Sequence, residues 1–390
     1  MTEARTYAIF LRRLLIVAAL AFGLPYGVSE ALKIWFGELP PAELAERQLK
    51  SRQTLYLSGL DQNVNIYKLE LTTRQNPAII AVGSSRALQV RDFFFNDSFV
   101  NWGLTVSSIA ALDWSVNEIL KLPKKPKLAI FFLDPWWFNG KFDNARDVFV
   151  AREARTTNIY RNTWLLGQRL FARKPLTQPN RLGLAAIDSN QGYDFYGSFH
   201  YISRITVGEP YDIKFQRTLR QIDTQDQRWI GENDVNPLAI ERWKAAKRRL
   251  EQNGIRVVEI LPPFPPAVAA RLREKGNHAY IGKIAPLLGP EAFDATSPAW
   301  VSRTSDCEFT DGIHGGEVVY AKALLDAAEK NPALRPFLRS DLLRGWTAAN
   351  EGNTSPATVA FYGSGAQEID FLKMGCKKSR PEMFDFRRPG

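Results

Sequence analysis

The stretch IIAVGSSRALQV, residues 79–90, contains the clearest indication of the fold. Its apolar residues stop at a glycine, two serines and an arginine, and a helical spacing of apolar residues begins directly afterwards. A short aliphatic run of this kind is typical of a buried strand, and the glycine and serines mark a turn. The stretch therefore predicts a strand that ends in a turn and continues as a helix.

Two more apolar runs follow, SFVNWGLTVSS at 98–108 and KLAIFFLDPWW at 127–137, and the segment between them has the spacing of an amphipathic helix. Strands that alternate with helices, and are apolar almost throughout, are typical of a parallel sheet covered on both faces. We therefore predict an α/β fold with a mostly parallel sheet in a three-layer α/β/α arrangement.

The same alternation bounds the domains. It is lost between about 141 and 236, which we interpret as an insertion in an α/β domain at 77–340, and it returns with a helix at 237–254 and a strand near 255–261. Beyond these we expect a helical stretch near 267–288, a short strand within 291–300 and a helix starting near Gly316. Residues 38–76 are predicted to be a juxtamembrane linker and helix, and 341–390 a loop-rich extension.

The N-terminus carries a candidate membrane anchor. Arg5, Arg12 and Arg13 precede LLIVAALAFGLPYGVS, residues 14–29, which is uncharged and mostly apolar. A span of about 20 residues crosses the hydrocarbon layer, and basic residues before it favour an exported domain after it. We predict a single-pass anchor within 1–37, in the cell membrane, with the rest on the periplasmic side. A cleavable signal peptide and a buried core helix are the alternatives.

Composition argues against two other classes of protein. The formal net charge is +10, but the basic residues are scattered and form no long run, so we predict no nucleic-acid binding. Two cysteines and three histidines provide no metal-ligand spacing, so we predict neither a metal nor a cofactor. Spacing alone leaves open whether Cys307 and Cys376 form a disulfide.

Four short motifs lie where predicted strands end or a late helix begins: Gly83–Arg86, Asn101–Gly103, Asp134–Trp137 and Asp311–His314. In an open parallel sheet, ligands bind beyond the carboxyl ends of the strands, so we expect these motifs to converge. A serine at the first turn needs a base within hydrogen-bond reach to become a nucleophile, and His314 with Asp311 can supply base and orienting carboxylate. The alternative is a purely structural role, in which Ser84 and Ser85 only cap the helix.

In this order the four motifs resemble those of the SGNH or GDSL hydrolase superfamily over roughly residues 78–331. That resemblance implies a flavodoxin-like sheet and a catalytic triad, in which Ser85 is the nucleophile, His314 the base and Asp311 the acid. It also implies oxyanion donors at the main-chain N–H groups of Ser85 and Gly103. Within the superfamily, GSSR, DGIHGG and an N-terminal anchor look most like the exported proteins that accompany membrane-bound O-acyltransferases, so such a transferase is the implied partner.

The third motif departs from that pattern. Where the superfamily has an asparagine-bearing turn, this chain has Asp134, and an ionised carboxylate cannot donate to an oxyanion. Asn101, Asn139 or Arg86 could replace the missing donor. Otherwise the oxyanion hole is weaker, or the site favours an acyl group handed over by a partner.

The function predicted from these residues and this resemblance is serine-dependent O-acyl transfer or ester hydrolysis through an acyl-serine. The expected acceptor is an extracytoplasmic polysaccharide or cell-wall polymer. A non-catalytic scaffold of the same fold, which binds polymer or an acyltransferase partner, is the main alternative. An esterase for small soluble substrates is the weaker one.

Overall fold

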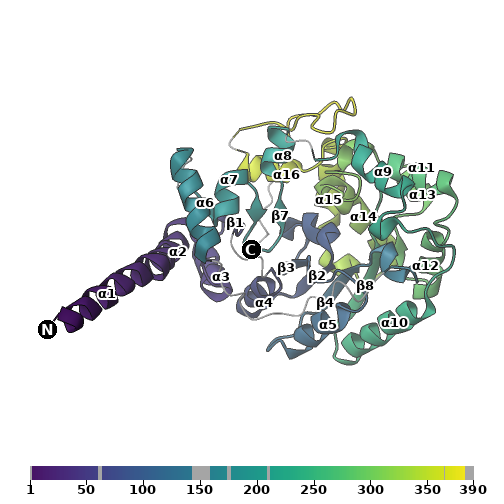
Figure 1. Ribbon diagram of the computed structural model, residues 1–390. Coiled ribbons are helices and arrows are strands. Elements are labelled where there is room, and N and C mark those ends of the chain that lie inside the picture. The colour runs from purple at the N-terminus through teal and green to yellow at the C-terminus, as the bar shows by residue number, and fades with distance from the viewer. Residues whose placement is uncertain are drawn as a thin grey trace. The chain divides into compact units, whose positions relative to one another are not determined.

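Five strands form one parallel sheet in the computed structural model, which describes residues 2–59, 64–142, 159–173, 177–208, 211–363 and 365–382 (Figure 1). Their order is β3-β2-β4-β8-β9, and each neighbouring pair is parallel. Counted along the chain this is the doubly wound order 2-1-3-4-5, whose switch point lies between β2 and β4. The predicted α/β fold with a mostly parallel sheet is confirmed. The strands are β2 (Ile79–Gly83), β3 (Phe99–Gly103), β4 (Leu128–Phe132), β8 (Arg256–Leu261) and β9 (Phe293–Asp294).

The chain divides into two compact units that differ from the predicted domains. The first comprises 1–63 and 152–192, and the second comprises 64–151 and 193–390. The predicted insertion at 141–236 is therefore shared between the units. Its segments 143–158, 174–176 and 209–210 lie outside the described residues, as do 364 and 383–390 of the predicted C-terminal extension.

Helices of the second unit pack on opposite faces of the sheet. Successive side chains of a strand point to opposite faces of the sheet, so the rings of Phe131 and Phe132 in β4 contact the helices on opposite faces. The Phe131 ring contacts Trp243 of α10 (Pro237–Gln252) at 4.9 Å between centroids, and the Phe132 ring contacts Tyr320 of α14 (Glu317–Lys330) at 5.5 Å. All four rings are buried, so the core lies on either side of the sheet.

Local sequence explains the bounds of α10. The Asn236 side chain caps its start by accepting the N–H of Leu238 at 3.0 Å, and Pro237 occupies the first helical position. The chain leaves the helix at Gly254, whose φ of 78° is the left-handed conformation that glycine adopts readily.

The remaining helices of the second unit include several that the sequence did not indicate. The predicted helical stretch at 267–288 is two helices, α11 and α12, and the predicted loop-rich extension contains α16 and most of α15. The α-helices not yet bounded are α4 (Val64–Gln75), α5 (Leu112–Lys121), α8 (Ile202–Thr206), α9 (Gln216–Asp223), α11 (Pro266–Lys275), α12 (Tyr280–Leu288), α13 (Pro298–Val301), α15 (Ser340–Ala349) and α16 (Pro356–Tyr362). The short 3₁₀ helices are η2 (Ser85–Gln89), η3 (Asp92–Phe94), η4 (Pro135–Phe138), η5 (Ile213–Phe215), η6 (Gln227–Trp229), η7 (Asp306–Glu308) and η8 (Arg335–Phe337), and β7 (Phe199–His200) is a two-residue strand.

The first unit is mostly helical. Its strands β1 (Leu55–Tyr56) and β5 (Arg181–Leu182) pair in parallel, and β6 (Gly192–Tyr193) falls at the boundary of the two units. Its helical elements are α1 (Thr2–Ala18), the π-helical turn η1 (Ala19–Gly23), α2 (Leu24–Phe36), α3 (Pro41–Lys50), α6 (Ile159–Phe171) and α7 (Leu184–Ser189).

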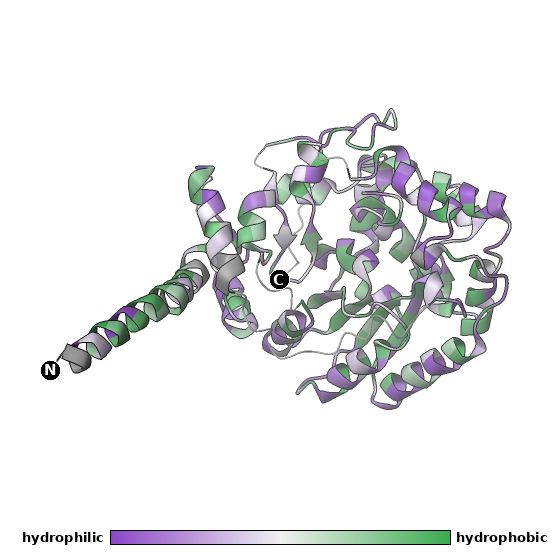
Figure 2. Cartoon of the chain, viewed as in Figure 1, coloured by the Kyte–Doolittle hydropathy of each residue, from purple (hydrophilic) through white to green (hydrophobic). Residues whose placement is uncertain are grey.

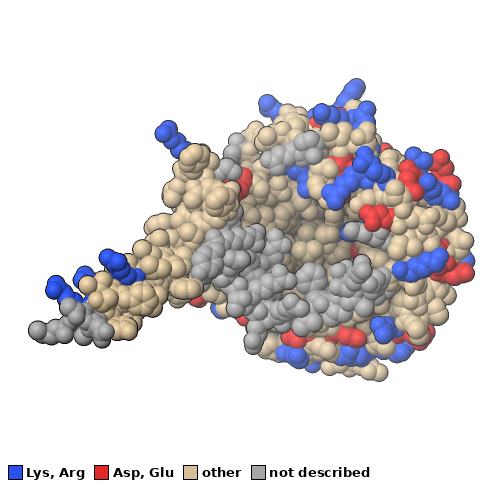
Figure 3. Space-filling model, viewed as in Figure 1, with Lys and Arg blue, Asp and Glu red and all other residues tan. Residues whose placement is uncertain are grey.

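The elements α1, η1 and α2 follow one another without interruption. They contain one helix that is long and apolar enough to cross a membrane by length and composition, and its most apolar window is fully exposed. Figure 2 shows this run as mostly hydrophobic, and Figure 3 shows basic side chains near its N-terminal end.

Candidate active site

The turn after β2 gives its two serines different tasks. Ser84 is the N-cap of η2, and its Oγ accepts the N–H of Arg86 at 3.1 Å, whereas Ser85 is the first residue of that helix. Close contacts fix the turn, because a Cβ on Gly83 would lie 3.0 Å from the carbonyl oxygen of Phe132. The predicted helix after the turn is instead two short 3₁₀ helices, so no extended helix dipole points at Ser85.

Ser85, His314 and Asp311 form one hydrogen-bonded relay. Ser85 Oγ lies 2.7 Å from His314 Nε2, and His314 Nδ1 lies 2.8 Å from Asp311 Oδ2 and 2.9 Å from Oδ1. A carboxylate at Nδ1 favours the tautomer with the proton on Nδ1, which leaves the Nε2 lone pair facing the serine hydroxyl. The relay joins residues 229 positions apart at the carboxyl end of β2.

Asp311 is held in its ionised form. Burial would raise the pKa of its carboxyl, but the neighbouring His314 and then Arg204 outweigh burial, and the pKa lies well below its ordinary value. Asp311 Oδ1 also accepts the main-chain N–H groups of Ile313 and His314, each at 2.9 Å. Arg204 Nη1 lies 3.4 Å from Oδ2. These contacts fix the orientation of the carboxylate as well as its charge.

Arg86 and Asp134 form a buried ion pair beside the relay. Arg86 Nη1 lies 3.3 Å from Asp134 Oδ1, and both side chains are inaccessible to solvent. Arg86 Nη2 donates to the carbonyls of Pro262, at 2.9 Å, and Pro263. Burial raises the pKa of Asp134 despite the opposing charge of Arg86. Arg86 is thus engaged with carbonyls and a carboxylate, and the structure does not present it as a replacement oxyanion donor.

The N–H donors of the second motif, Asn101–Gly103, are also taken up by hydrogen bonds within the protein. Asn101 Nδ2 donates to the carbonyls of Ala87 and Val90, at 2.8 and 3.0 Å, while Asn101 Oδ1 accepts the N–H of Gly103 at 2.7 Å. Asn101 is fully buried, so its polar atoms require these partners. This differs from the sequence prediction, because neither the Asn101 amide nor the Gly103 N–H is free to bind an oxyanion.

Asn139 is likewise engaged elsewhere. Its Nδ2 donates to the carbonyl of Ile230 at 2.7 Å, and its Oδ1 accepts the N–H of Lys141 at 2.8 Å. Among the predicted oxyanion donors of the described residues, the N–H of Ser85 and the Nε–H of Arg86 have no hydrogen-bond acceptor, and the Arg86 side chain is fully buried.

A lysine supports the strand that carries the second motif. Lys68 Nζ donates to the carbonyl of Asn101 at 2.8 Å and to that of Gly197. Burial lowers the pKa of Lys68 to about 7, although Asp194 opposes that shift. The main chain at the end of β3 is therefore held by a buried amine.

Arg228 of η6 is a functional candidate that the sequence did not reveal. Its guanidinium lies 4.9 Å from the ring centroid of Trp136, which the Arg86 guanidinium also contacts at 5.3 Å. Arg228 is half-buried, and in the described parts of the chain it makes no hydrogen bond or ion pair. Burial lowers its pKa, while Asp134 and Asp311 are close enough to oppose that shift. Arg228 thus places spare cationic donors near the relay.

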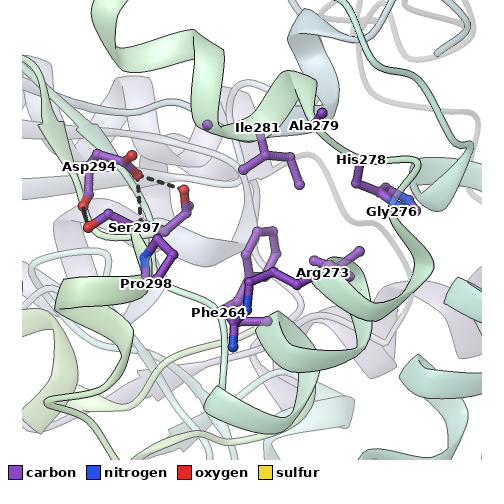
Figure 4. Close-up of a pocket in the computed structure, with 13 residues that line it drawn as sticks. Phe264, Arg273, Gly276, His278, Ala279, Ile281, Asp294, Ser297 and Pro298 are labelled. Carbon is purple, nitrogen blue, oxygen red and sulfur yellow. Dashed lines mark hydrogen bonds between the residues drawn. The ribbon is translucent and has the colours of Figure 1, made fainter.

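A separate cavity of about 450 Å³ lies between α11, α12 and the segment after β9 (Figure 4). Phe264 lines it and also contacts the Arg86 guanidinium at 4.4 Å from its ring centroid. Asp294, at one side of the cavity, accepts the N–H and hydroxyl of Thr296 at 2.8 and 2.6 Å. None of the predicted site residues lines this cavity.

Cys307 and Cys376 form a disulfide, with Cα atoms 5.7 Å apart, and so settle a pairing that spacing left open. In the part of the chain that the structure describes, no group of three or more His, Cys, Asp or Glu side chains could hold a metal ion. Comparison of the chain with protein-family models, with curated proteins and with solved structures gives no match in any of the three.

Proposed function

We propose that the protein is a membrane-anchored, exported, serine-dependent O-acyltransferase or esterase of the SGNH type. Its acceptor would be an extracytoplasmic polysaccharide or cell-wall polymer. The observation that carries this proposal is the relay of Ser85, His314 and Asp311 at the carboxyl end of β2, with both hydrogen bonds shorter than 3 Å. The doubly wound strand order and the packing of α10 and α14 on opposite faces support the proposed three-layer arrangement.

The relay supports two successive transfers. Ser85 Oγ attacks the carbonyl carbon of an acyl ester while its proton passes to His314 Nε2. The ester C–O bond then breaks, His314 gives that proton to the departing oxygen, and the acyl group stays on Ser85. An acceptor hydroxyl, or water, next loses its proton to His314 and attacks the acyl-serine, and Ser85 leaves with the proton returned from His314.

Stabilisation of the oxyanion is assigned to the Ser85 N–H and Arg228. The Ser85 N–H is free of described acceptors, and the Arg228 guanidinium has unused donors near Asp134 and Asp311. A cation in a water-poor site stabilises developing negative charge strongly. In this proposal Arg228 replaces the asparagine of the superfamily pattern, and Asp134 orients Arg86 instead of donating.

Two observations support an exported domain. Arg5, Arg12 and Arg13 of α1 precede the apolar stretch that begins at Leu14, as expected for a cytoplasmic N-terminus. The disulfide between Cys307 and Cys376 is a bond that persists in oxidising compartments. Within this proposal the acyl donor is supplied by a membrane-bound O-acyltransferase, a partner implied by the family resemblance.

Turnover of a chromogenic acetyl ester by the full chain in detergent tests this proposal. Ser85→Ala should lower kcat/KM at least about 10⁴-fold, because the nucleophile is lost. Ser84→Ala is the matched control. It removes a cap worth about 1 kcal/mol of stability but leaves the relay in place, so it should retain turnover.

The non-catalytic scaffold remains a second candidate because Gly103 and Asn101 direct their donors inward. A protein of that kind would bind polymer through the same fold without forming an acyl-serine. Equal background rates for the wild type and Ser85→Ala would favour the scaffold.

A further inference from the structure

Helix α6 packs against the membrane-spanning candidate within the first unit (Figure 1). Leu166 of α6 shares a buried cluster with Phe36 of α2, and Val28 of α2 packs against the same cluster. The guanidinium of Arg169 lies 5.3 Å from the ring centroid of Phe36 and pairs with Asp188. The contact between α2 and α6 is thus a packed interface, formed by an apolar cluster and supported by an ion pair.

The depth of this contact follows from the register of the span. If Arg13 marks the cytoplasmic edge of the hydrocarbon layer, the roughly 20 residues needed to cross it end near Ile34. Trp35 and Ile34 are both exposed, and a tryptophan is favoured at that outer interface. Val28 lies six residues before Ile34, which is about 9 Å deeper at 1.5 Å per residue. The packing of α6 on α2 therefore begins at the depth of the outer leaflet.

The opposite face of α6 is apolar and exposed. Trp164 is 67% exposed and Phe171 is 94% exposed. They are seven residues apart and so lie within about 20° of each other, on the side of the helix away from the buried Leu166. Leu170 is also exposed, and a Cβ on Gly167 would meet no atom within 4 Å. Together Trp164, Gly167, Leu170 and Phe171 span an arc of about 120° on α6, which we call the outer stripe, with Leu170 at the edge nearer Leu166.

We propose that α6 lies in the outer interface of the membrane with the outer stripe in lipid, so that a second helix holds the first unit against the bilayer beside the span. This inference rests on the proposed membrane anchor. A helix with a wide apolar stripe lies in the interface plane with that stripe among the acyl chains. The exposed Arg173, just after α6, can reach lipid phosphates from there. Lipid is the occupant because α6 packs on α2 at the depth of the outer leaflet, and the outer stripe faces away from that contact.

Single fluorescent probes in the full chain, reconstituted into liposomes without any other protein, test this inference. Both native cysteines are in the disulfide, so Phe171→Cys introduces the only free thiol, and Trp164→Cys supplies a second reporter on the same stripe. Ala245→Cys, on the exposed side of α10, is the matched control. Each thiol is labelled with an environment-sensitive dye, and its quenching by nitroxide-bearing lipids is measured.

An interfacial helix is buried about 5–10 Å below the headgroups, so shallow nitroxides should quench the dye at both stripe positions at least about twofold. The dye at position 245 should remain unquenched. Absence of quenching at positions 164 and 171, in a protein that still floats with the liposomes, would overturn the inference and indicate a stripe that faces water or a partner protein. Acetyl-ester turnover of the same samples reports separately on the proposed function.

Discussion

Asp311→Asn is the substitution whose effect the geometry fixes most sharply. Asp311 Oδ1 accepts two main-chain N–H groups, from Ile313 and His314, so the carbonyl oxygen of an asparagine must take that position. Its NH₂ group then occupies the place of Oδ2, which is 2.8 Å from His314 Nδ1. An amide there donates to Nδ1, so the imidazole proton moves to Nε2 and that nitrogen can no longer accept the proton of Ser85.

The expected loss is large for such a small change in shape. In a serine protease with the same relay, the wrong tautomer lowers kcat about 10⁴-fold, which corresponds to about 5 kcal/mol of barrier. The same logic applies here because the two acceptor distances at Nδ1 fix the tautomer. We therefore expect kcat/KM for the acetyl ester to fall roughly 10⁴-fold.

Arg204→Gln is the control for Asp311→Asn. It removes the guanidinium that lies 3.4 Å from Asp311 Oδ2 but leaves the histidine contact, so its effect should stay within the roughly 1.5–3 kcal/mol expected of one hydrogen bond to a charged group. The chemical shifts of the His314 ring nitrogens would show the tautomer directly. Turnover of Asp311→Asn within about tenfold of the wild type, with the proton still on Nδ1, would refute the reasoning.

Three further changes follow from the same structure. Arg228→Gln should lower kcat about 10²–10³-fold with little change in KM, because one oxyanion donor is lost. Arg217→Gln, at an exposed arginine on the neighbouring helix, is the control and should change neither kcat nor KM. Equal effects of the two substitutions would show that Arg228 does not stabilise the oxyanion. Replacing Cys307 and Cys376 by serine should lower the free energy of unfolding by roughly 4 kcal/mol in denaturant titrations, because a loop of 69 residues is no longer closed; an unchanged midpoint would contradict this. Lys68 has a folded pKa of about 7, below its unfolded value, so the unfolded chain binds more protons between pH 7 and 10 and stability should rise by about 1 kcal/mol per pH unit in that window. Lys68→Met should abolish that slope, and a slope that persists would assign it to other groups.

Much of the sheet could be predicted because its signal is local. The runs ending at Gly83, Gly103 and Phe132 are apolar at nearly every position, as strands buried on both faces must be. The pairing of Asp311 with His314 could also be predicted from the sequence, because a carboxylate three positions before a histidine in the same loop can orient its imidazole. Their meeting with Ser85 was predicted by placing this loop at the edge where the parallel strands end, although in the structure the loop precedes α14 and does not follow a strand.

The rest of the site depends on long-range contacts that leave no local pattern. Arg204 and Arg228 lie on short elements within the predicted insertion, where no helical or strand period marks a functional side chain. Arg204 meets Asp311, 107 positions away along the chain, and Arg228 stacks on the ring of Trp136. A sequence without periodicity gives no means of pairing residues so far apart.

The C-terminal segment shows the same limit. Buried carboxylates organise it, because Glu317 accepts the N–H groups of Ala357 and Thr358 at the start of α16, at 2.8 and 3.1 Å. Glu368 accepts those of Thr354 and Ser355, both at 2.7 Å. Contacts between residues 13 to 41 positions apart define a segment that the sequence predicts only as loop.

Covalent labelling with a fluorophosphonate probe tests the central claim most directly, because such a probe bonds to a serine only when a neighbouring base activates its hydroxyl. We predict one adduct per chain, located by mass spectrometry on Ser85, and its loss in His314→Ala while Ser84→Ala still reacts. A folded protein that forms no adduct, or forms it on another residue with equal rates in the wild type and His314→Ala, would contradict the account.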